Sequence, residues 1–244
     1  MAVDLRGRAA LVTGAGHRVG RAIAVALGAR GMRVAVHYRG AAGGARETVR
    51  LIEAAGGAGE PFAADLAEPD APAHLVDAVH ARFGALDLLV NSAAVMERTP
   101  IGTVTAAQWD AMFAVNLRAP FLAAQAAAAV MPAGSAIVNV ADLAAFETWP
   151  AYVPHGITKA GIVQMTRALA RALAPRIRVN AVAPGAVLLP DNWGAEAAAR
   201  LVSTTPLGRL GTADDVAGAV VYLASADYVT GETIIVDGGR HVRT

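Results

Sequence analysis

The sequence predicts an α/β protein with a doubly wound, seven-stranded parallel sheet. Short apolar runs such as RAALVT, RVAVHY and LDLLVN alternate with longer segments whose apolar residues recur at helical spacing. Strands that alternate with helices are typical of parallel sheets covered by helices on both faces. The 244 residues fit one large α/β domain, and no linker, repeat or low-complexity boundary divides them. We therefore expect a single domain over residues 1–244.

Each element follows from its own stretch of sequence. Apolar runs predict strands at residues 8–13, 33–38, 61–64, 86–91, 136–140, 177–182 and 232–236. Between them, amphipathic or Ala-rich stretches predict helices at residues 18–30 and 45–55, a helix ending at Phe83, and a long helix at 106–130. A further helix begins near Pro154, because proline is favoured in the first turn of a helix.

Composition excludes several function classes. The chain is 55% hydrophobic and 17% charged, with a net charge of +1 and no cysteine. It has no basic field that would attract nucleic acid or an anionic membrane, and no disulfide or thiolate metal site. No charge-free apolar run reaches the ~18 residues of a membrane span, and the charged N-terminus does not resemble a signal peptide. We expect a cytoplasmic protein with a small-molecule substrate, and no metal site, since no metal-ligand motif is present.

A glycine-rich turn follows the first predicted strand, in LVTGAGHRVGRAIA at residues 11–24. Gly14, Gly16 and Gly20 are spaced G-x-G-x-x-x-G, close to the spacing of dinucleotide-binding turns. Between a strand and a helix, such a turn lets backbone N–H groups approach a pyrophosphate. A glycine turn can also simply end a strand, but its place in the first βα unit favours a Rossmann-type dinucleotide site.

The end of the second strand indicates which dinucleotide binds. A carboxylate there would hold the ribose 2′-hydroxyl of NAD, whereas cationic groups accommodate the 2′-phosphate of NADP. The sequence has His37, Tyr38 and Arg39, with His17 and Arg18 in the facing loop, and no acid. Two guanidiniums could grip the phosphate together. Arg18 and Arg39 could also be ordinary solvated charges, but we expect NADP(H).

A second cluster lies around the fifth strand. His155 and Lys159 are four residues apart on the predicted helix, so their side chains share one face. Asp142 follows the strand at its carboxyl end, where open α/β sheets bind their ligands. An acid, an imidazole and an ammonium group that converge there predict a site that handles protons.

Taken together, these motifs resemble the short-chain dehydrogenase/reductase family over essentially the whole chain. The matching pieces, in order, are the turn at 13–20, Asp65, Asn91-Ser92-Ala93-Ala94, Asn116, Lys159, Arg178-Val179-Asn180, Pro184-Gly185 and the closing segments 230–232 and 236–239. The resemblance implies hydride transfer with NADPH/NADP as cofactor, and a homotetramer.

Several features are similar to the pteridine reductase branch of that family. They are Arg18 in place of the middle glycine, the His37-Tyr38-Arg39 segment, Asp142 in place of a serine, and residues 184–190. This resemblance implies an NADPH-dependent reductase of a C=N or C=O bond, with a pteridine as the favoured substrate. The alternatives are a general carbonyl reductase of the 3-oxoacyl type, and an NADP(H)-binding protein without turnover.

The resemblance also assigns residues. It implies cofactor binding by Gly14, Gly16, His17, Arg18, Val19, Gly20, His37, Tyr38, Arg39, Asp65, Leu66, Asn91, Ser92, Ala93, Lys159, Pro184, Gly185 and Val187. It implies catalytic roles for Asn116, Asp142, His155 and Lys159, with Lys159 on the nicotinamide ribose and Asn116 holding a water.

His155 stands where the family has a tyrosine, four residues before the lysine. Three interpretations follow: Asp142 is the main acid and His155 assists it, the imidazolium acts directly, or the site binds NADPH without turnover. The segment 188–205, after the cofactor-binding Pro-Gly, is expected to form a lid over the substrate. Expected substrate contacts are Met96, Arg98, Leu188, Leu189, Asn192 and Trp193.

Overall fold

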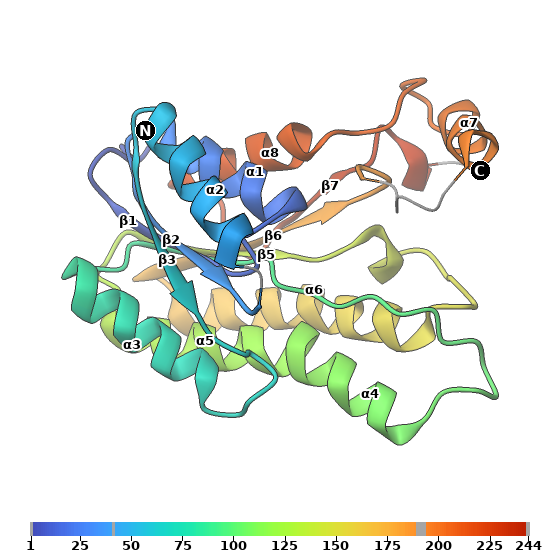
Figure 1. Ribbon diagram of the computed structural model, residues 1–244, viewed down its shortest axis with the longest axis horizontal. Helices are drawn as coiled ribbons and strands as arrows, with labels where there is room; N and C mark the ends of the chain where they lie inside the picture. The colour runs from blue at the N-terminus through green and yellow to red at the C-terminus, as the bar shows by residue number, and fades with distance from the viewer. Residues whose placement is uncertain (1, 41, 189–193, 243–244) are drawn as a thin grey trace.

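The computed structural model describes residues 2–40, 42–188 and 194–242. Seven parallel strands form one sheet in the order β3-β2-β1-β4-β5-β6-β7 (Figure 1), which confirms the predicted doubly wound fold. The strands are β1 (Ala9–Val12), β2 (Arg33–Tyr38), β3 (Ala58–Ala63), β4 (Leu88–Asn91), β5 (Ser135–Val140), β6 (Ile177–Pro184) and β7 (Thr233–Val236).

Helices cover both faces of the sheet. They are α1 (Arg18–Gly28), α2 (Ala42–Ala54), α3 (Ala71–Phe83), α4 (Ala106–Phe113), α5 (Ala119–Val130), α6 (Val153–Leu173), α7 (Ala195–Ser203) and α8 (Ala213–Ser225). Short 3₁₀ turns lie at Leu143–Ala145 and Arg240–Val242, and a π-helical turn at Ala114–Arg118 joins α4 to α5. Figure 1 shows α1, α2 and α8 on one face and α3, α4, α5 and α6 on the other.

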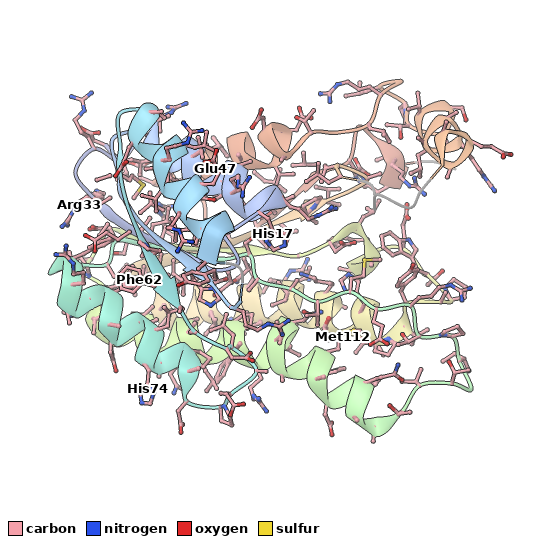
Figure 2. The ribbon with its side chains drawn as sticks, in the orientation of Figure 1. His17, Arg33, Glu47, Phe62, His74 and Met112 are labelled. Atoms are coloured by element: carbon pink, nitrogen blue, oxygen red, sulfur yellow. The ribbon has the colours of Figure 1, made fainter. Side chains whose placement is uncertain are left out.

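The core explains why the strands read as uninterrupted apolar runs. Successive residues of β1 point to opposite faces, so that Ala10 and Val12 pack beneath α1 and α8 while Leu11 packs with α3 and α5. All are fully buried. On the second face Phe62 of β3 meets Phe83 of α3 edge to face, with ring centroids 6.0 Å apart (Figure 2). Burial on both faces makes the central strands mostly apolar, and buried polar residues in them, such as Asn91 and Asn139, are paired by hydrogen bonds.

Two parts of the fold differ from expectation. Strand β3 begins at Ala58 rather than residue 61, because it is an edge strand that pairs only with β2 and therefore tolerates glycine, proline and exposed polar residues. Helices α7 and α8 were not predicted. The sequence signal of α8 lies at its start, where Thr212 and Asp215 form a capping box.

The helical run from Ala106 to Val130 has a mean hydropathy of 1.3 in its most apolar window, and by length and composition alone it could cross a membrane. In the structure its inner side packs against α3 and α6, and its middle carries a buried, hydrogen-bonded asparagine, Asn116. A core helix of a globular domain has the same properties. The expectation that no membrane is involved stays a prediction.

Candidate functional site

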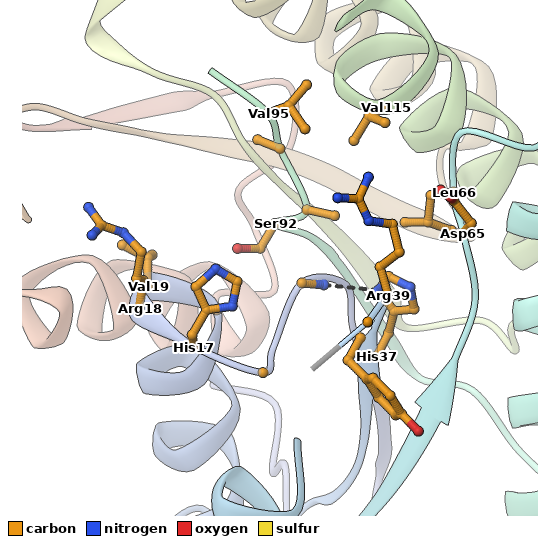
Figure 3. A pocket seen from close by; sticks show the side chains of 17 residues that line it. His17, Arg18, Val19, His37, Arg39, Asp65, Leu66, Ser92, Val95 and Val115 are labelled. Carbon is orange, nitrogen blue, oxygen red and sulfur yellow. Dashed lines mark hydrogen bonds between the residues drawn. The ribbon is translucent and has the colours of Figure 1, made fainter. Parts of the chain in front are cut away.

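A pocket lies where the strand order reverses, between the carboxyl ends of β1 and β4, as expected for a doubly wound sheet. It encloses about 520 Å³. Figure 3 shows its lining, which consists of Gly14, Gly16, His17, Arg18, Val19, Gly20, His37, Tyr38, Arg39, Gly40, Asp65, Leu66, Ser92, Ala93, Ala94, Val95 and Val115. The structure therefore brings together thirteen of the predicted cofactor residues, counted from this lining. The sequence interpretation did not include Gly40, Ala94, Val95 and Val115.

The first turn can exist only with glycine at two of its positions. Gly14 has φ +67°, and a Cβ atom there would lie 2.8 Å from the Cα atom of Ala93. A Cβ atom on Gly20 would lie 2.3 Å from the carbonyl oxygen of Gly14. The turn thus packs directly against both the first turn of α1 and the loop after β4. This close packing opens the backbone toward the pocket, as a pyrophosphate site requires.

Arg18 and Arg39 both line the pocket, but they do not converge. Figure 3 shows them on opposite sides of it. Arg18 adopts φ +51°, which is rare for a residue with a side chain, and its Nη2 atom donates to the carbonyl oxygen of Leu188 at 2.7 Å. The expectation that the two guanidiniums grip one phosphate together is therefore not met in this structure. Arg39 alone lies at the end of β2.

His37 lines the pocket, and backbone groups hold its ring; its contact with the cofactor stays a prediction. Its ring is buried, and both nitrogens are occupied: Nδ1 accepts from the Gly14 amide at 3.0 Å, and Nε2 lies 3.1 Å from the Ala64 carbonyl oxygen. Burial lowers the pKa of His37, while the Ala64 carbonyl and Asp65 act in the opposite direction. His37 is thus a neutral support behind the glycine turn.

Asn91 is tied into the sheet rather than into the pocket lining. Its amide nitrogen donates to Oδ1 of Asn139 at 2.9 Å, and the Asn139 amide donates to the Thr166 hydroxyl on α6. The other predicted cofactor residues outside the lining are Lys159, Pro184, Gly185 and Val187. Their roles, and that of Asn91, stay predictions.

The structure assembles the predicted proton-handling group at the end of β5. The Oδ2 atom of Asp142 lies 3.7 Å from Nε2 of His155, and its Oδ1 atom accepts from the Ala144 amide at 2.8 Å. Lys159 is buried one helical turn after His155 and donates from Nζ to the Val140 carbonyl oxygen at 2.9 Å. Burial lowers the pKa of Lys159, and the Asp142 carboxylate opposes this shift.

His155 is the most unusual member of this group. Only 2% of it is exposed, yet neither ring nitrogen has a hydrogen-bond partner among the residues that the structure describes. The distance to Asp142 is too long for a hydrogen bond. A buried polar group without a partner is rare in proteins and carries a desolvation penalty. The ring therefore has two open positions, one facing a carboxylate.

Asn116 lies on the π-helical turn, where one extra residue interrupts the long helix. Its side-chain oxygen accepts from the Val95 amide at 2.8 Å, and its amide nitrogen donates to the Val95 carbonyl oxygen at 2.8 Å and to the Thr158 hydroxyl at 3.3 Å. The side chain thus fixes the loop after β4 to the helix that carries His155. That it holds a water stays a prediction.

The residues expected to contact substrate lie in exposed loops. Met96 is 52% exposed, and Leu188 and Arg98 are also exposed. Leu189, Asn192 and Trp193 fall outside the described residues, so their roles and that of a lid over 188–205 stay predictions. Phe146, which follows the 3₁₀ turn after β5, is also exposed and was not predicted. An apolar side chain after Asp142 was the available sequence signal.

Comparison with known proteins gives a consistent result. A family model described as Enoyl-(Acyl carrier protein) reductase matches residues 14–241. The 3beta-hydroxysteroid dehydrogenase 1 of Eggerthella lenta is 38% identical over 97% of this chain and 94% of its own length.

Two solved structures are closely similar. A short-chain dehydrogenase/reductase from Serratia marcescens superposes with a TM-score of 0.93 at 33% identity, covering 98% of this chain and 100% of its own. The angucycline C-6 ketoreductase LanV, with bound NADP, superposes with a TM-score of 0.90 at 37% identity, covering 98% of both chains. Because the family model and these relatives span nearly the whole sequence, the chain belongs to the short-chain dehydrogenase/reductase family of NAD(P)-dependent oxidoreductases.

Proposed function

We propose that this protein is an NADPH-dependent reductase of ketones in which His155 delivers the proton. The pocket at the switch point suits a dinucleotide with an added phosphate, since Arg39 stands at the end of β2 and His17 and Arg18 lie across from it. Bound NADPH would supply a hydride to the carbonyl carbon of the substrate. The protein must then place a proton on the carbonyl oxygen.

The observation that carries this proposal is the open imidazole of His155 beside Asp142. One ring nitrogen lies 3.7 Å from a carboxylate oxygen, and both nitrogens are buried with no hydrogen bond to any part of the chain that the structure describes. A small approach would let Asp142 bind and orient one nitrogen, which frees the other to donate to a substrate oxygen. The Asp142 side chain is 25% exposed, so it connects the buried ring to solvent protons. Lys159 adds a positive charge beside the developing alkoxide.

A ketone is a better candidate than a pteridine. By their descriptions, LanV is a ketoreductase and the Eggerthella lenta relative is a hydroxysteroid dehydrogenase; neither name refers to a pteridine. The exposed apolar side chains Met96, Phe146 and Leu188 come from loops near the carboxyl edge of the sheet. We infer an apolar ketone as the substrate, bound beneath these loops.

The test is NADPH oxidation by the purified protein with a panel of acceptors: a hydrophobic cyclic ketone, a 3-oxoacyl thioester, an enoyl thioester and a dihydropteridine. We expect turnover with one or both carbonyl compounds and none with the dihydropteridine. Turnover with the dihydropteridine alone would replace the ketone by a pteridine. NADPH binding without any turnover would show a binding protein instead of a reductase.

A further inference from the structure

Hydrogen bonds to neighbouring segments hold the glycine turn in place, and His37 makes two of them. The Gly14 amide donates to Nδ1 of His37, and Nε2 of the same ring faces the Ala64 carbonyl oxygen. The backbone oxygen of His37 accepts from the Ala15 amide at 2.9 Å. A single buried residue on β2 thus joins the segment after β1 to the segment after β3, in the wall of the pocket.

The two partners determine the protonation state of the ring. A backbone amide can only donate and a backbone carbonyl can only accept, so Nδ1 must be unprotonated and Nε2 must carry the hydrogen. The ring is therefore neutral, in one tautomer. If Nδ1 also took up a proton, its N–H and the N–H of Gly14 would point at each other across 3.0 Å. The Gly14 amide would then lose its acceptor.

The remaining carbonyl groups of the turn are held as well. The Thr48 hydroxyl on α2 donates to the Ala15 oxygen at 2.9 Å, and Nη2 of Arg21 donates to the Gly16 oxygen at 2.6 Å. Because these two carbonyl oxygens are bonded to Thr48 and Arg21, they are held in place. The amides that follow at the start of α1 can then face an anion. The turn has the shape of a phosphate site because its polar groups are fixed on the opposite side.

We propose that His37 is a positioning residue for the dinucleotide: its neutral imidazole fixes the glycine turn, and NADPH binding weakens when the ring takes up a second proton. This inference rests on the proposed use of NADPH and adds a determinant of affinity that acts through the glycine turn. It concerns binding alone and requires no turnover.

Several charged groups surround the ring. Asp65 follows β3, Arg39 comes directly after β2, and His17 and Arg18 lie across the pocket. Burial lowers the pKa of His37 from its ordinary value of 6.5, and Asp65 offsets part of that shift. The lowered pKa keeps the ring neutral near pH 7 and moves the expected loss of affinity to more acidic pH. Stability follows the same direction, because the unfolded chain takes up this proton first as the pH falls.

The experiment is a fluorescence titration with NADPH between about pH 5 and pH 8, within the range where circular dichroism shows the fold intact. His37→Asn keeps an acceptor near the Nδ1 position and cannot titrate, whereas His37→Leu removes both hydrogen bonds. Thr48→Val loosens the same turn without removing the titratable ring. The titration of the NADPH phosphate is common to all four proteins and cancels in the comparison.

At neutral pH we expect His37→Leu to bind NADPH about tenfold more weakly, the effect of losing about one buried hydrogen bond. His37→Asn should stay within about threefold of wild type and lose the extra weakening at low pH, since a threefold change corresponds to less than one hydrogen bond. Thr48→Val should retain that weakening. The inference is overturned if His37→Asn and wild type share one pH curve, or if His37→Leu binds as wild type does. Failure of wild type to bind NADPH at any pH would overturn both this inference and the proposed function.

Discussion

At the scale of single residues, Lys159 is subject to two opposing effects, burial of its charge and attraction to Asp142. Its ammonium group is buried, with only one hydrogen bond in the described residues, to the Val140 carbonyl oxygen. Burial lowers its pKa because the charged form loses hydration, and Asp142 compensates in part. We therefore expect the buried ammonium to lower stability, as buried charges at active sites commonly do.

Replacing Lys159 by methionine should therefore raise stability and abolish turnover. A methionine fills the same space without a buried charge, so we expect an increase of up to about 2 kcal/mol in the free energy of unfolding near neutral pH. In wild type the penalty should shrink as the pH rises toward 10.5, because the folded protein releases this proton before the unfolded chain does. Urea unfolding across the alkaline range measures both effects.

The control is Arg171→Met, which removes an exposed cation from the same helix. It should change the free energy of unfolding by less than about 0.5 kcal/mol. A Lys159→Met protein that is less stable than wild type at neutral pH would contradict this account of the buried ammonium.

Residue types in the sequence were sufficient to predict Asp142, His155 and Lys159 as one group, because a strand end and a helical spacing place them together. The role of His37 could not be predicted in this way. Its position near the end of β2 suggested a site close to the cofactor phosphate, whereas the structure adds that its ring bonds to backbone groups of two other segments. Backbone partners leave no trace in residue types, so such roles emerge only from the structure.

At the scale of elements, the guanidinium group of Arg178 caps the C-terminal end of helix α8. Arg178 on β6 donates from Nη1 to the Leu223 oxygen and from Nη2 to the Ala224 oxygen, both at 2.7 Å. These carbonyls belong to the last turn of α8, where unpaired oxygens and the helix dipole favour a cation. Arg178 therefore fixes α8 to the sheet beneath it.

We expect Arg178→Met to lower the free energy of unfolding by about 1–3 kcal/mol, the range for charge-assisted hydrogen bonds to buried groups. NADPH affinity should not change, because α8 does not line the pocket. Thermal unfolding and an NADPH titration measure the two quantities. Unchanged stability would show that water replaces the guanidinium on these carbonyls.

The elements themselves were largely predictable. Strand β2 was placed at its observed bounds, and the other interior strands were placed within two residues of theirs, because these strands are mostly apolar on both faces. The edge strand β3 and the helix α8 were not, since an edge strand carries few apolar residues and the AVVYLA run of α8 has no clear helical period. The π-helical turn at Asn116 depends on contacts with the loop at Val95, which no local pattern encodes.

At the scale of the whole molecule, helix α5 carries no charge on its outer side and is mostly apolar there, as it is on its inner side. Phe121, Gln125 and Ala129 follow each other at helical spacing, all are exposed, and none is charged. A helix that is apolar all round is usually covered on both sides. The family resemblance implies a homotetramer, and we predict that a second copy of the chain covers this side.

Phe121→Glu should then dissociate the assembly, because it places a carboxylate in an apolar interface. Sedimentation velocity should show a single larger species for wild type and a smaller one for the variant. Ala54→Glu, which adds the same charge to the exposed end of α2, should leave the assembly intact. A wild-type protein that sediments as a monomer would contradict the prediction.

The role of His155 as proton donor is tested most directly by the single-turnover rate of NADPH oxidation with the best ketone of the panel. We expect His155→Phe to lower this rate at least about 100-fold, the magnitude of lost general acid catalysis. The Kd for NADPH should stay within about threefold of wild type, because the cofactor pocket does not include His155. His155→Tyr serves as the matched variant. Equal rates in wild type and His155→Phe would contradict proton delivery by His155, and so would an inert wild type that His155→Tyr renders active.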